Sequence, residues 1–471
     1  MAIVEQPVTQ IEPSSELIAK ERYTSKEYLA LERERLWPHV WQMACRVEEI
    51  PNVGDYIEYA IGTQSVLIVR ESADSIRAYR NSCLHRGTRL AEGCGALADD
   101  EIRCRFHGWA WALDGSISEV PDAHDFDPER VTRAALQLPE ALVGTWGGFV
   151  FVNLDRDAGS LEEFLGPIPA VYAPFEPEKM RFLKFTTTVM ECNWKAGVDA
   201  FNEAYHLEAT HMWDLSGMAG SYGMASALDA RRKGRDASGA TRGSHAFRYD
   251  IYRNTNMMSI TERATQEGPL VGELAGDPRA AVRKMLTVQI SMSLAHTDEV
   301  DHLDSLDEMP LDMPLNDFFV LLRKESGKRR GLDYSHLSDY DVLGMLDFCF
   351  YPNLVGPITA GNWNFFRFRP NGDDPDTCLF DWMCLHRYGD DEVVAPLEKA
   401  WYPDWRMTRD WGPVISQDLD NMGKVQRGMH EETYPGLRLG RQEEGIRNLH
   451  RFLDRYIGDS RPAVTSRRAM T

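Results

Sequence analysis

Cysteine, positive charge and long apolar runs are all scarce in this sequence of 471 residues. Its eight cysteines are too few for a dense disulfide framework, and in a reducing compartment a cysteine near a histidine favours metal binding over cross-linking. The formal net charge of −21 argues against the basic surface that nucleic acid phosphates require, and it also disfavours an anionic membrane surface. We therefore expect neither nucleic acid nor a membrane among its partners.

Segments for export or membrane insertion are missing as well. No stretch approaches the roughly 18 apolar residues that a membrane span requires. Residues 1–23 lack a basic segment followed by an apolar run, so no signal peptide is recognisable. These absences favour a cytoplasmic protein. Its hydrophobic content of 43% and its length favour sizeable cores and two domains.

The first part of the chain has the pattern of a β module. Short alternating or apolar runs separated by turn residues fill residues 55–155, which predicts an all-β segment. Residues 21–41 predict a helix before its first strand. A proline-rich passage at residues 161–179 leads out of the module.

A larger module of strands and helices is expected after this passage. Residues 181–192 predict a strand, residues 193–208 predict a helix, and three runs within 346–388 predict long neighbouring strands. Residues 443–458 predict an amphipathic closing helix. Its apolar side would carry Ile446, Leu449, Leu453 and Tyr456 or Ile457.

Residues 83–107, CLHRGTRLAEGCGALADDEIRCRFH, bring four potential metal ligands close together in sequence. They form two mixed pairs, Cys83 with His85 and Cys104 with His107. Zinc sites normally combine a cysteine pair with a histidine pair, whereas a Rieske two-iron two-sulfur centre binds one iron through two cysteines and the other through two histidines. The mixed order therefore favours the cluster. Cys94 lies outside the pattern and is expected to be a small buried or loop thiol.

A second set of potential ligands lies in NWKAGVDAFNEAYHLEATH, residues 193–211. If the segment begins as one helix, Asp199, Glu203 and His206 share a face at i, i+4 and i+7. His211 would reach the same place from the end of that helix. Two histidines need a carboxylate to complete the facial triad that binds ferrous iron and leaves positions open.

The late segment QDLDNM offers two carboxylates, Asp418 and Asp420, for the third position. Residue type alone leaves both available, because an acid in a helix also serves as a cap or interacts with the helix dipole.

Three sequence motifs resemble those of the Rieske non-heme iron ring-hydroxylating oxygenases, and specifically of the large, or alpha, terminal oxygenase subunit. CLHRGTRL and CRFHGWAWALDGS resemble the cluster loops, and Glu-x-Tyr-His-x-x-x-x-His resembles the mononuclear iron motif. The resemblance implies that Cys83 and Cys104 bind one iron of a 2Fe-2S Rieske cluster and that His85 and His107 bind the other. It also implies a mononuclear Fe(II) site. The ligands of that site would be His206, His211 and Asp418, the acid four residues before Met422.

The resemblance implies an α+β fold, with a Rieske 2Fe-2S β domain inserted in a helix-grip catalytic domain. In the catalytic domain an antiparallel sheet would surround a long helix. We expect the Rieske domain at residues 45–157 and the catalytic mononuclear iron domain at residues 158–471. Residues 1–44 would form a helical segment that packs with the catalytic part.

The resemblance further implies a function, namely hydroxylation with O2 and electrons that come ultimately from NAD(P)H through a ferredoxin, a flavin reductase or both. We expect cis-dihydroxylation of a hydrophobic aromatic or polycyclic substrate. A Rieske monooxygenase or demethylase would use the same metals. An electron carrier would need only the cluster, and a zinc-bearing interaction protein is a further alternative.

The family's electron path gives Glu203 a catalytic role, because its carboxylate would connect the iron site to a cluster histidine of a neighbouring subunit. This implies a homotrimer, with or without a small beta subunit, and Asp199 is the alternative bridge. A substrate pocket could draw on an apolar set of residues, namely Met218, Met224, Phe247, Met257, Met258, Met285 and Trp363. An arginine within residues 231–253 could pair with a carboxylated substrate.

Overall fold

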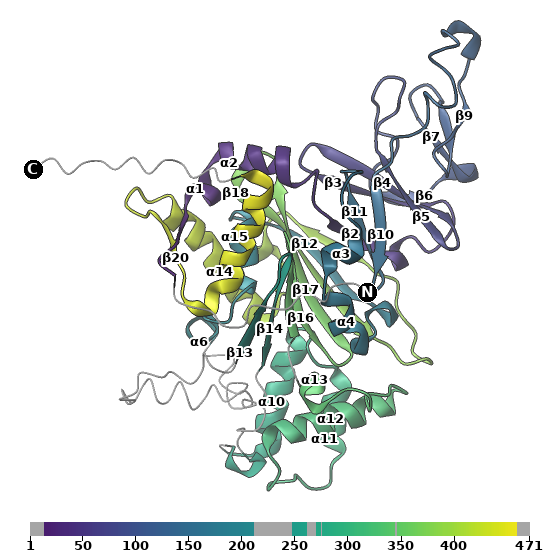
Figure 1. The fold of residues 1–471 in the computed structure, drawn as a ribbon. Helices are drawn as coiled ribbons and strands as arrows, with labels where there is room; N and C mark the ends of the chain where they lie inside the picture. Colours follow the sequence, from purple (N-terminus) through teal and green to yellow (C-terminus); the bar gives the residue numbers. More distant parts are fainter. Residues whose placement is uncertain (1–13, 212–246, 261–269, 275, 344–345, 459–471) are drawn as a thin grey trace, which may run out of the picture. The chain divides into compact units, whose positions relative to one another are not determined.

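The computed structural model describes residues 14–211, 247–260, 270–274, 276–343 and 346–458 (Figure 1). The chain divides into two compact units. The β unit comprises Ala30–Pro169 and Pro177–Lys179, and the sheet-helix unit comprises the remaining described residues. None of the described helices has the length and apolar character that crossing a membrane requires.

The β unit contains three small sheets, and its strands confirm the pattern that the sequence predicts. The first sheet has the order β5-β4-β3-β6, with β3 (Asp55–Ile61), β4 (Gln64–Ser72), β5 (Ser75–Arg80) and β6 (Cys94–Ala96). The second has the order β10-β11-β2, with β2 (Gln42–Arg46), β10 (Leu142–Trp146) and β11 (Phe149–Asn153). The third consists of β7 (Glu101–Arg103), β8 (Ala110–Ala112) and β9 (Ile117–Glu119). Cys94 is exposed in β6, so it is not a buried thiol.

The helix predicted over residues 21–41 is interrupted. It forms α1 (Glu21–Thr24) and α2 (Lys26–Leu31), followed by a wider helical turn at Glu32–Leu36. Ser25 lies between α1 and α2 in an extended conformation, and its hydroxyl accepts a hydrogen bond of 3.1 Å from the Tyr28 backbone N–H. A serine in this position caps a new helix start, which explains the break.

The sheet-helix unit is built on an eight-stranded sheet with the order β13-β14-β15-β16-β17-β18-β12-β19. Its strands are β12 (Met180–Met190), β13 (Phe247–Ile251), β14 (Thr255–Ile260), β15 (Leu346–Phe350), β16 (Leu354–Thr359), β17 (Asn362–Asn371), β18 (Asp374–Arg387) and β19 (Lys399–Tyr402). All neighbouring strands are antiparallel except β12 and β19, which are parallel. The predicted strands and the α+β class are confirmed.

Three helices lie close to this sheet (Figure 1). Helix α5 (Trp194–Phe201) packs on β16, β17 and β18, α15 (Glu444–Ile457) packs on β13 and β14, and α14 (Gly412–Met429) packs on α5. The predicted closing helix is confirmed as α15, with Ile446, Leu449, Leu453 and Ile457 buried. Helix α5 approaches the sheet closely at Gly197, where a Cβ atom would lie 2.3 Å from Phe368 Cδ1.

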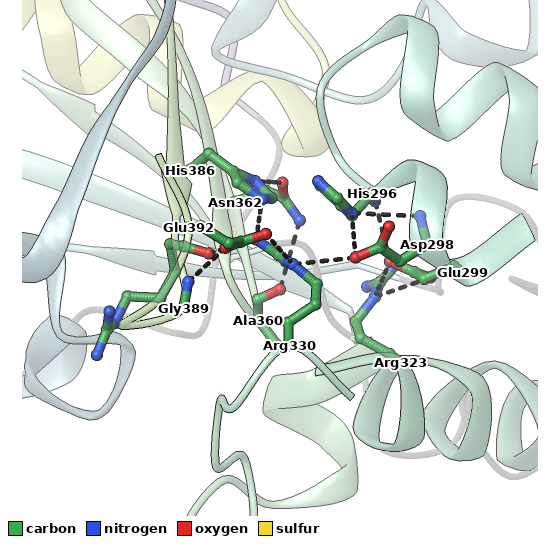
Figure 2. Close-up of polar contacts among 11 residues, drawn as sticks. His296, Asp298, Glu299, Arg323, Arg330, Ala360, Asn362, His386, Gly389 and Glu392 are labelled. Carbon is green, nitrogen blue, oxygen red and sulfur yellow. Dashed lines mark hydrogen bonds and ion pairs between the residues drawn. The ribbon is translucent and has the colours of Figure 1, made fainter. Parts of the chain in front are cut away.

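A separate group of helices comprises α10 (Pro278–Ser291), α11 (Thr297–Ser305), α12 (Leu315–Arg329) and α13 (Asp339–Leu343). Arg330, directly after α12, connects this group to the sheet (Figure 2). Its guanidinium donates to Glu392 at 2.8 and 3.0 Å and lies 3.1 Å from Asp298 Oδ2 at α11. It also lies 2.7 Å from Nε2 of the buried His386 on β18.

This network determines the protonation of His386. Arginine can only donate, so His386 Nε2 accepts and Nδ1 carries the proton that goes to Asn362 Oδ1, 2.7 Å away. Burial and the positive charge of Arg330 lower the pKa of His386 to about 2. The ring of His296 stacks on His386 with a centroid distance of 4.3 Å. The helical group is therefore joined to the sheet by a neutral histidine between charged groups.

Candidate metal centres

The two Cys-His loops of the β unit have the same backbone construction. Cys83 and Cys104 each accept a hydrogen bond through their carbonyl from the N–H of a glycine four residues later, at 2.9 and 3.0 Å. These glycines, Gly87 and Gly108, have φ of +78° and +77°. Glycine adopts this left-handed conformation without steric cost, so each loop can turn tightly after its histidine.

The loops bring the four predicted cluster ligands together. Cys83 and Cys104 are buried, and burial together with a hydrogen bond between the two side chains raises the pKa of the Cys83 thiol. The rings of His85 and His107 lie 4.6 Å apart between centroids. Trp109 stacks on His85 at 4.9 Å with an interplanar angle of 6°. The tryptophan therefore holds the His85 ring in one plane.

The donor chemistry of this group fits an iron-sulfur cluster. His85 Nδ1 is buried and has no hydrogen-bond partner among the described residues, which is the state expected of a ligand atom. Two thiols and two imidazoles match the ligand set of a Rieske centre. The four side chains do not form a group whose ligand atoms all lie within 4.8 Å of one another, as far as the described residues show. A single tetrahedral zinc ion would require such convergence.

The helix predicted over residues 193–208 is wrong in its second half. Helix α5 ends at Phe201, and a short helix, α6 (Leu207–Thr210), follows after a non-helical turn. The Glu203 carboxylate accepts hydrogen bonds from the backbone N–H groups of Tyr205 and His206, the latter at 3.1 Å. These side-chain bonds replace the helical pattern, as capping carboxylates do at a helix start. Asp199, Glu203 and His206 consequently do not share one helix face.

The break nevertheless brings His206 and His211 to one point. His206 lies directly before α6 and His211 directly after it, so the short helix spaces them. Asp418 reaches the same point from α14, with its Oδ1 atom 3.1 Å from His211 Nε2 and 3.7 Å from His206 Nε2. The ligand atoms of these three residues lie within 4.8 Å of one another, and they are the only such group among the described residues.

Hydrogen bonds orient both imidazoles toward Asp418. His211 Nδ1 lies 2.7 Å from Gln417 Oε1, and His206 Nδ1 lies 2.5 Å from Glu203 Oε1. Because these oxygens accept, each Nδ1 carries a proton and each Nε2 directs a lone pair at the Asp418 oxygen. Two imidazoles and one carboxylate that converge in this way are the ligand set of a facial triad, which fits a ferrous ion.

The electrostatic surroundings of His206, His211 and Asp418 also favour a cation at this site. Burial lowers the pKa of His206, but its hydrogen bond to Glu203 and the negative charges of Glu203 and Asp418 raise it, and the net shift is upward. The site thus favours a positive charge. Asp418 is only 4% exposed and His211 only 1%. The side chain of Asp420 is 51% exposed and pairs with Lys424, so it does not approach the histidines.

Asp199 belongs to a different group of side chains. Its Oδ2 atom accepts a hydrogen bond of 2.5 Å from the Tyr23 hydroxyl, which also lies 2.7 Å from His450 Nε2. Burial raises the pKa of Asp199 to about 7 despite this hydrogen bond and the nearby charge of Lys195. Glu203, by contrast, bonds His206 directly.

The other predicted residues have mixed outcomes. Met257, Met258, Met285 and Trp363 are buried. Met218, Met224 and most of the arginine-rich segment 231–253 lie outside the described residues, as does the side chain of Phe247. Gln417 was not predicted, and its only sequence signal is its position directly before Asp418.

Two family models match this chain, and each covers one of the two candidate metal centres. Residues 40–136 match the family model of the Rieske [2Fe-2S] domain. Residues 175–459 match the model described as ring hydroxylating alpha subunit, catalytic domain. Together the two domains imply a Rieske cluster and a non-heme iron as the cofactors.

Individual relatives match only part of the chain. The oxygenase subunit of carnitine monooxygenase from Escherichia coli is 31% identical over 194 residues, which are 40% of this chain and 50% of that protein. The large subunit of anthranilate 1,2-dioxygenase from Acinetobacter baylyi is 35% identical over 32% of this chain and 31% of its own length. This chain therefore matches about half or less of these relatives.

Solved structures match over nearly the whole chain at low identity. A quaternary ammonium Rieske monooxygenase gives a TM-score of 0.61 with 18% identity, covering 95% of this chain and 100% of that one. Naphthalene 1,2-dioxygenase gives 0.63 with 19% identity, covering 95% and 93%. These likenesses concern the fold. Because the catalytic-domain model alone spans more than half of the chain, this protein belongs to the ring-hydroxylating alpha subunit family, with a Rieske [2Fe-2S] domain preceding its catalytic domain.

Proposed function

We propose that this chain is a terminal oxygenase that uses electrons and O2 to hydroxylate a small organic substrate. The observation that supports this most is the convergence of the ligand atoms of His206, His211 and Asp418 in a chain of this family. Electrons would come ultimately from NAD(P)H through a partner ferredoxin or flavin reductase. The proposed oxygenase has no membrane or nucleic acid partner.

In this proposal Cys83 and Cys104 hold one iron of the cluster, and His85 and His107 hold the other. Neutral imidazoles in place of two thiolates raise the potential of such a cluster, so it can accept electrons from an ordinary ferredoxin. Trp109 keeps the His85 ring fixed while the electron passes, because it stacks along the whole ring.

At the second site His206, His211 and Asp418 would hold ferrous iron on one side. Bound there, iron would supply the oxygen chemistry, because a facial triad leaves coordination positions open. Gln417 and Glu203 keep the protons of the two imidazoles on Nδ1, so that both Nε2 atoms stay available as ligands. Burial of His211 and Asp418 excludes bulk water from this side.

Glu203 is proposed to link the iron site with a cluster histidine of a neighbouring subunit. Its hydrogen bond to His206 supports this role, because a carboxylate can join two imidazole N–H groups. The proposal requires a homotrimer, with or without a small beta subunit. Light scattering of the purified chain should then give three times the chain mass of 53.6 kDa, and a stable monomer would contradict it.

Two substrate classes follow from the relatives. Cis-dihydroxylation of an aromatic or polycyclic hydrophobe is supported by the family description and by the fold of naphthalene 1,2-dioxygenase. Monooxygenation of a quaternary ammonium compound is supported by the carnitine and glycine betaine monooxygenases among the partial matches. In both classes the same two iron sites would do the chemistry.

A single-turnover experiment with labelled O2 tests the proposal. The reduced protein is mixed with ¹⁸O2 and either naphthalene or a quaternary amine such as carnitine, choline or glycine betaine. Two labelled atoms in one product indicate dioxygenation, and one labelled atom indicates monooxygenation. His206→Ala should keep the cluster absorbance and give no product. Absence of labelled product from both classes, in protein loaded with both metals, would contradict the proposed function.

A further inference from the structure

The sheet-helix unit contains a half-buried acid, Asp347 on β15, for which the described residues supply no cation. Its Oδ1 atom is inaccessible to solvent and has no hydrogen-bond partner among the described residues. The only group of the described chain that stabilises its charge is the backbone N–H of Gly356. A carboxylate oxygen that is buried without a partner is costly and therefore uncommon in a core that has only a structural role.

Another acid of the same sheet shows what a structural carboxylate looks like. Asp381 on β18 has no exposed surface, but Arg367 and Arg369 both donate to it, at 2.8 and 3.0 Å, and so does Thr187. These positive charges hold the pKa of Asp381 far below its usual range, although burial opposes them. Burial instead raises the pKa of Asp347 well above its usual range.

The strand register shows which face of the sheet carries Asp347. Asp347 lies opposite Met258 on β14, and Met258 lies opposite Tyr249 on β13, so these three side chains form one row across the sheet. The neighbouring residue, Phe348, points to the other face, where its ring lies 4.8 Å from that of Tyr172. The row and Tyr172 are therefore on opposite sides of β15.

This row contacts the chain segment that carries His206 and shares an apolar cluster with the helix that carries Asp418. The Tyr249 hydroxyl accepts a hydrogen bond of 3.3 Å from the backbone N–H of Ala204, two residues before His206. Tyr249 and Met258 also pack in one apolar cluster with Ala204 and with Val414, which lies one turn before Asp418 on α14. A molecule that rests on this row would consequently lie next to the iron site.

The chemistry of the row fits one class of substrate. A carboxylate oxygen without a partner binds a positive charge, while an aromatic ring and a thioether accommodate the methyl groups of an alkylated nitrogen. We propose that Asp347 determines substrate specificity by pairing with the cationic nitrogen of an N-alkylated ammonium substrate that rests on Tyr249 and Met258. This inference rests on the proposed oxygenase function and selects the second of its two substrate classes.

Binding to the oxidised, metal-loaded protein without reductant tests the proposal. Choline is compared by calorimetry with its neutral carbon isostere, 3,3-dimethylbutan-1-ol, which has the same shape without the charge. The wild-type protein should bind choline at least about tenfold more tightly than the isostere. Asp347→Asn should bring the two affinities close to each other and leave the iron content unchanged. The exposed acid variant Asp420→Asn should keep the preference.

Equal binding of choline and the isostere by the wild-type protein would overturn the proposal, and so would an unchanged preference in Asp347→Asn. If Asp347→Asn does not fold, the wild-type comparison still decides, together with Asp347→Glu, which keeps the charge and should retain the preference. The proposed oxygenase function can fail separately. Asp347-dependent choline binding without any oxygenated product would contradict only that function, whereas turnover of naphthalene without choline binding would contradict only this inference.

Discussion

At the scale of single residues, Glu203 has two structural roles, one for each oxygen of its carboxylate. The sequence alone does not distinguish these roles. Its Oε2 atom accepts from the backbone N–H of His206 and so ends the helical pattern after α5, while its Oε1 atom holds the His206 ring. Glutamine keeps the size of the side chain but removes its negative charge. A charged carboxylate accepts a stronger hydrogen bond from imidazole than a neutral amide does. The backbone turn can therefore persist while the electron path is weakened.

We predict that Glu203→Gln retains both metals and a reducible cluster but slows the reoxidation of that cluster by substrate and O2 sharply. Stopped-flow absorbance of the reduced cluster measures this rate. Asp199→Asn is the matched control, because Asp199 bonds Tyr23 and not His206. Reoxidation at the wild-type rate in Glu203→Gln, with slow reoxidation in Asp199→Asn, would assign the bridge to Asp199.

His386 gives a prediction about pH. In the unfolded chain a histidine has a pKa near 6.5, whereas the pKa of folded His386 is lowered to about 2. The unfolded state therefore binds a proton below about pH 6.5 that the folded state rejects, and stability falls as the pH decreases. The loss is about 1.4 kcal/mol for each pH unit below this value.

Replacing His386 by glutamine, which cannot be protonated in this range, should remove this part of the pH dependence. The fall in melting temperature between pH 7.5 and pH 5.5, measured by calorimetry, should be smaller in His386→Gln than in the wild type. The buried His450, whose pKa burial also lowers, remains in both proteins and cancels in the comparison. An equal fall in both proteins would show that His386 accepts a proton without unfolding.

Much of the candidate site could be predicted at the residue scale, and the limits have physical reasons. Cys83, His85, Cys104 and His107 are close in sequence, so their spacing alone indicates a shared centre. Asp418 could be distinguished from Asp420 only through the family resemblance, because both are acids on one helix. Their different neighbours, the two histidines and Lys424, appear only in the folded chain. Gln417 and Asp347 acquire their meaning from tertiary contacts and were not predictable.

At the scale of secondary structure, periodicity predicted the strands and the amphipathic α15 but missed the break between α5 and α6. Residues 193–208 have a helical pattern, and the competing hydrogen bonds of the Glu203 side chain are invisible to such a pattern. The interruption at Ser25 has the same kind of cause, since its hydroxyl begins a new helix. Side-chain capping thus overrode helix propensity at both places.

The space around two helical glycines, Gly197 on α5 and Gly428 on α14, predicts opposite effects when each is replaced by alanine. At Gly197 an added Cβ atom would lie 2.3 Å from Phe368 Cδ1, so Gly197→Ala should destabilise the protein by about 1 to 3 kcal/mol. At Gly428, on α14, a Cβ atom would meet nothing within 4 Å, so Gly428→Ala should stabilise by about 0.4 to 1 kcal/mol. Melting temperatures measure both effects. An unchanged melting temperature in Gly197→Ala would mean that the sheet moves away from α5 without a loss of stability.

At the scale of the whole molecule, the chain combines two kinds of iron chemistry in separate units. The β unit carries the cysteine and histidine loops, and the sheet-helix unit carries the two histidines and Asp418. Family membership implies both cofactors, while the seven residues that would hold them are the proposal. Substitution of a ligand in one set should therefore leave the metal content of the other site unchanged.

Iron and acid-labile sulfide, measured together in three forms of the protein, test this central claim most directly. We predict about three irons and two sulfides for each wild-type chain, because a Rieske cluster contains two of each and the triad binds one more iron. Asp418→Ala should keep the two sulfides and lose about one iron, and Asp420→Ala should match the wild type. Zinc in place of iron in the wild type would contradict the account. A full iron count in Asp418→Ala together with a loss of iron in Asp420→Ala would contradict it equally.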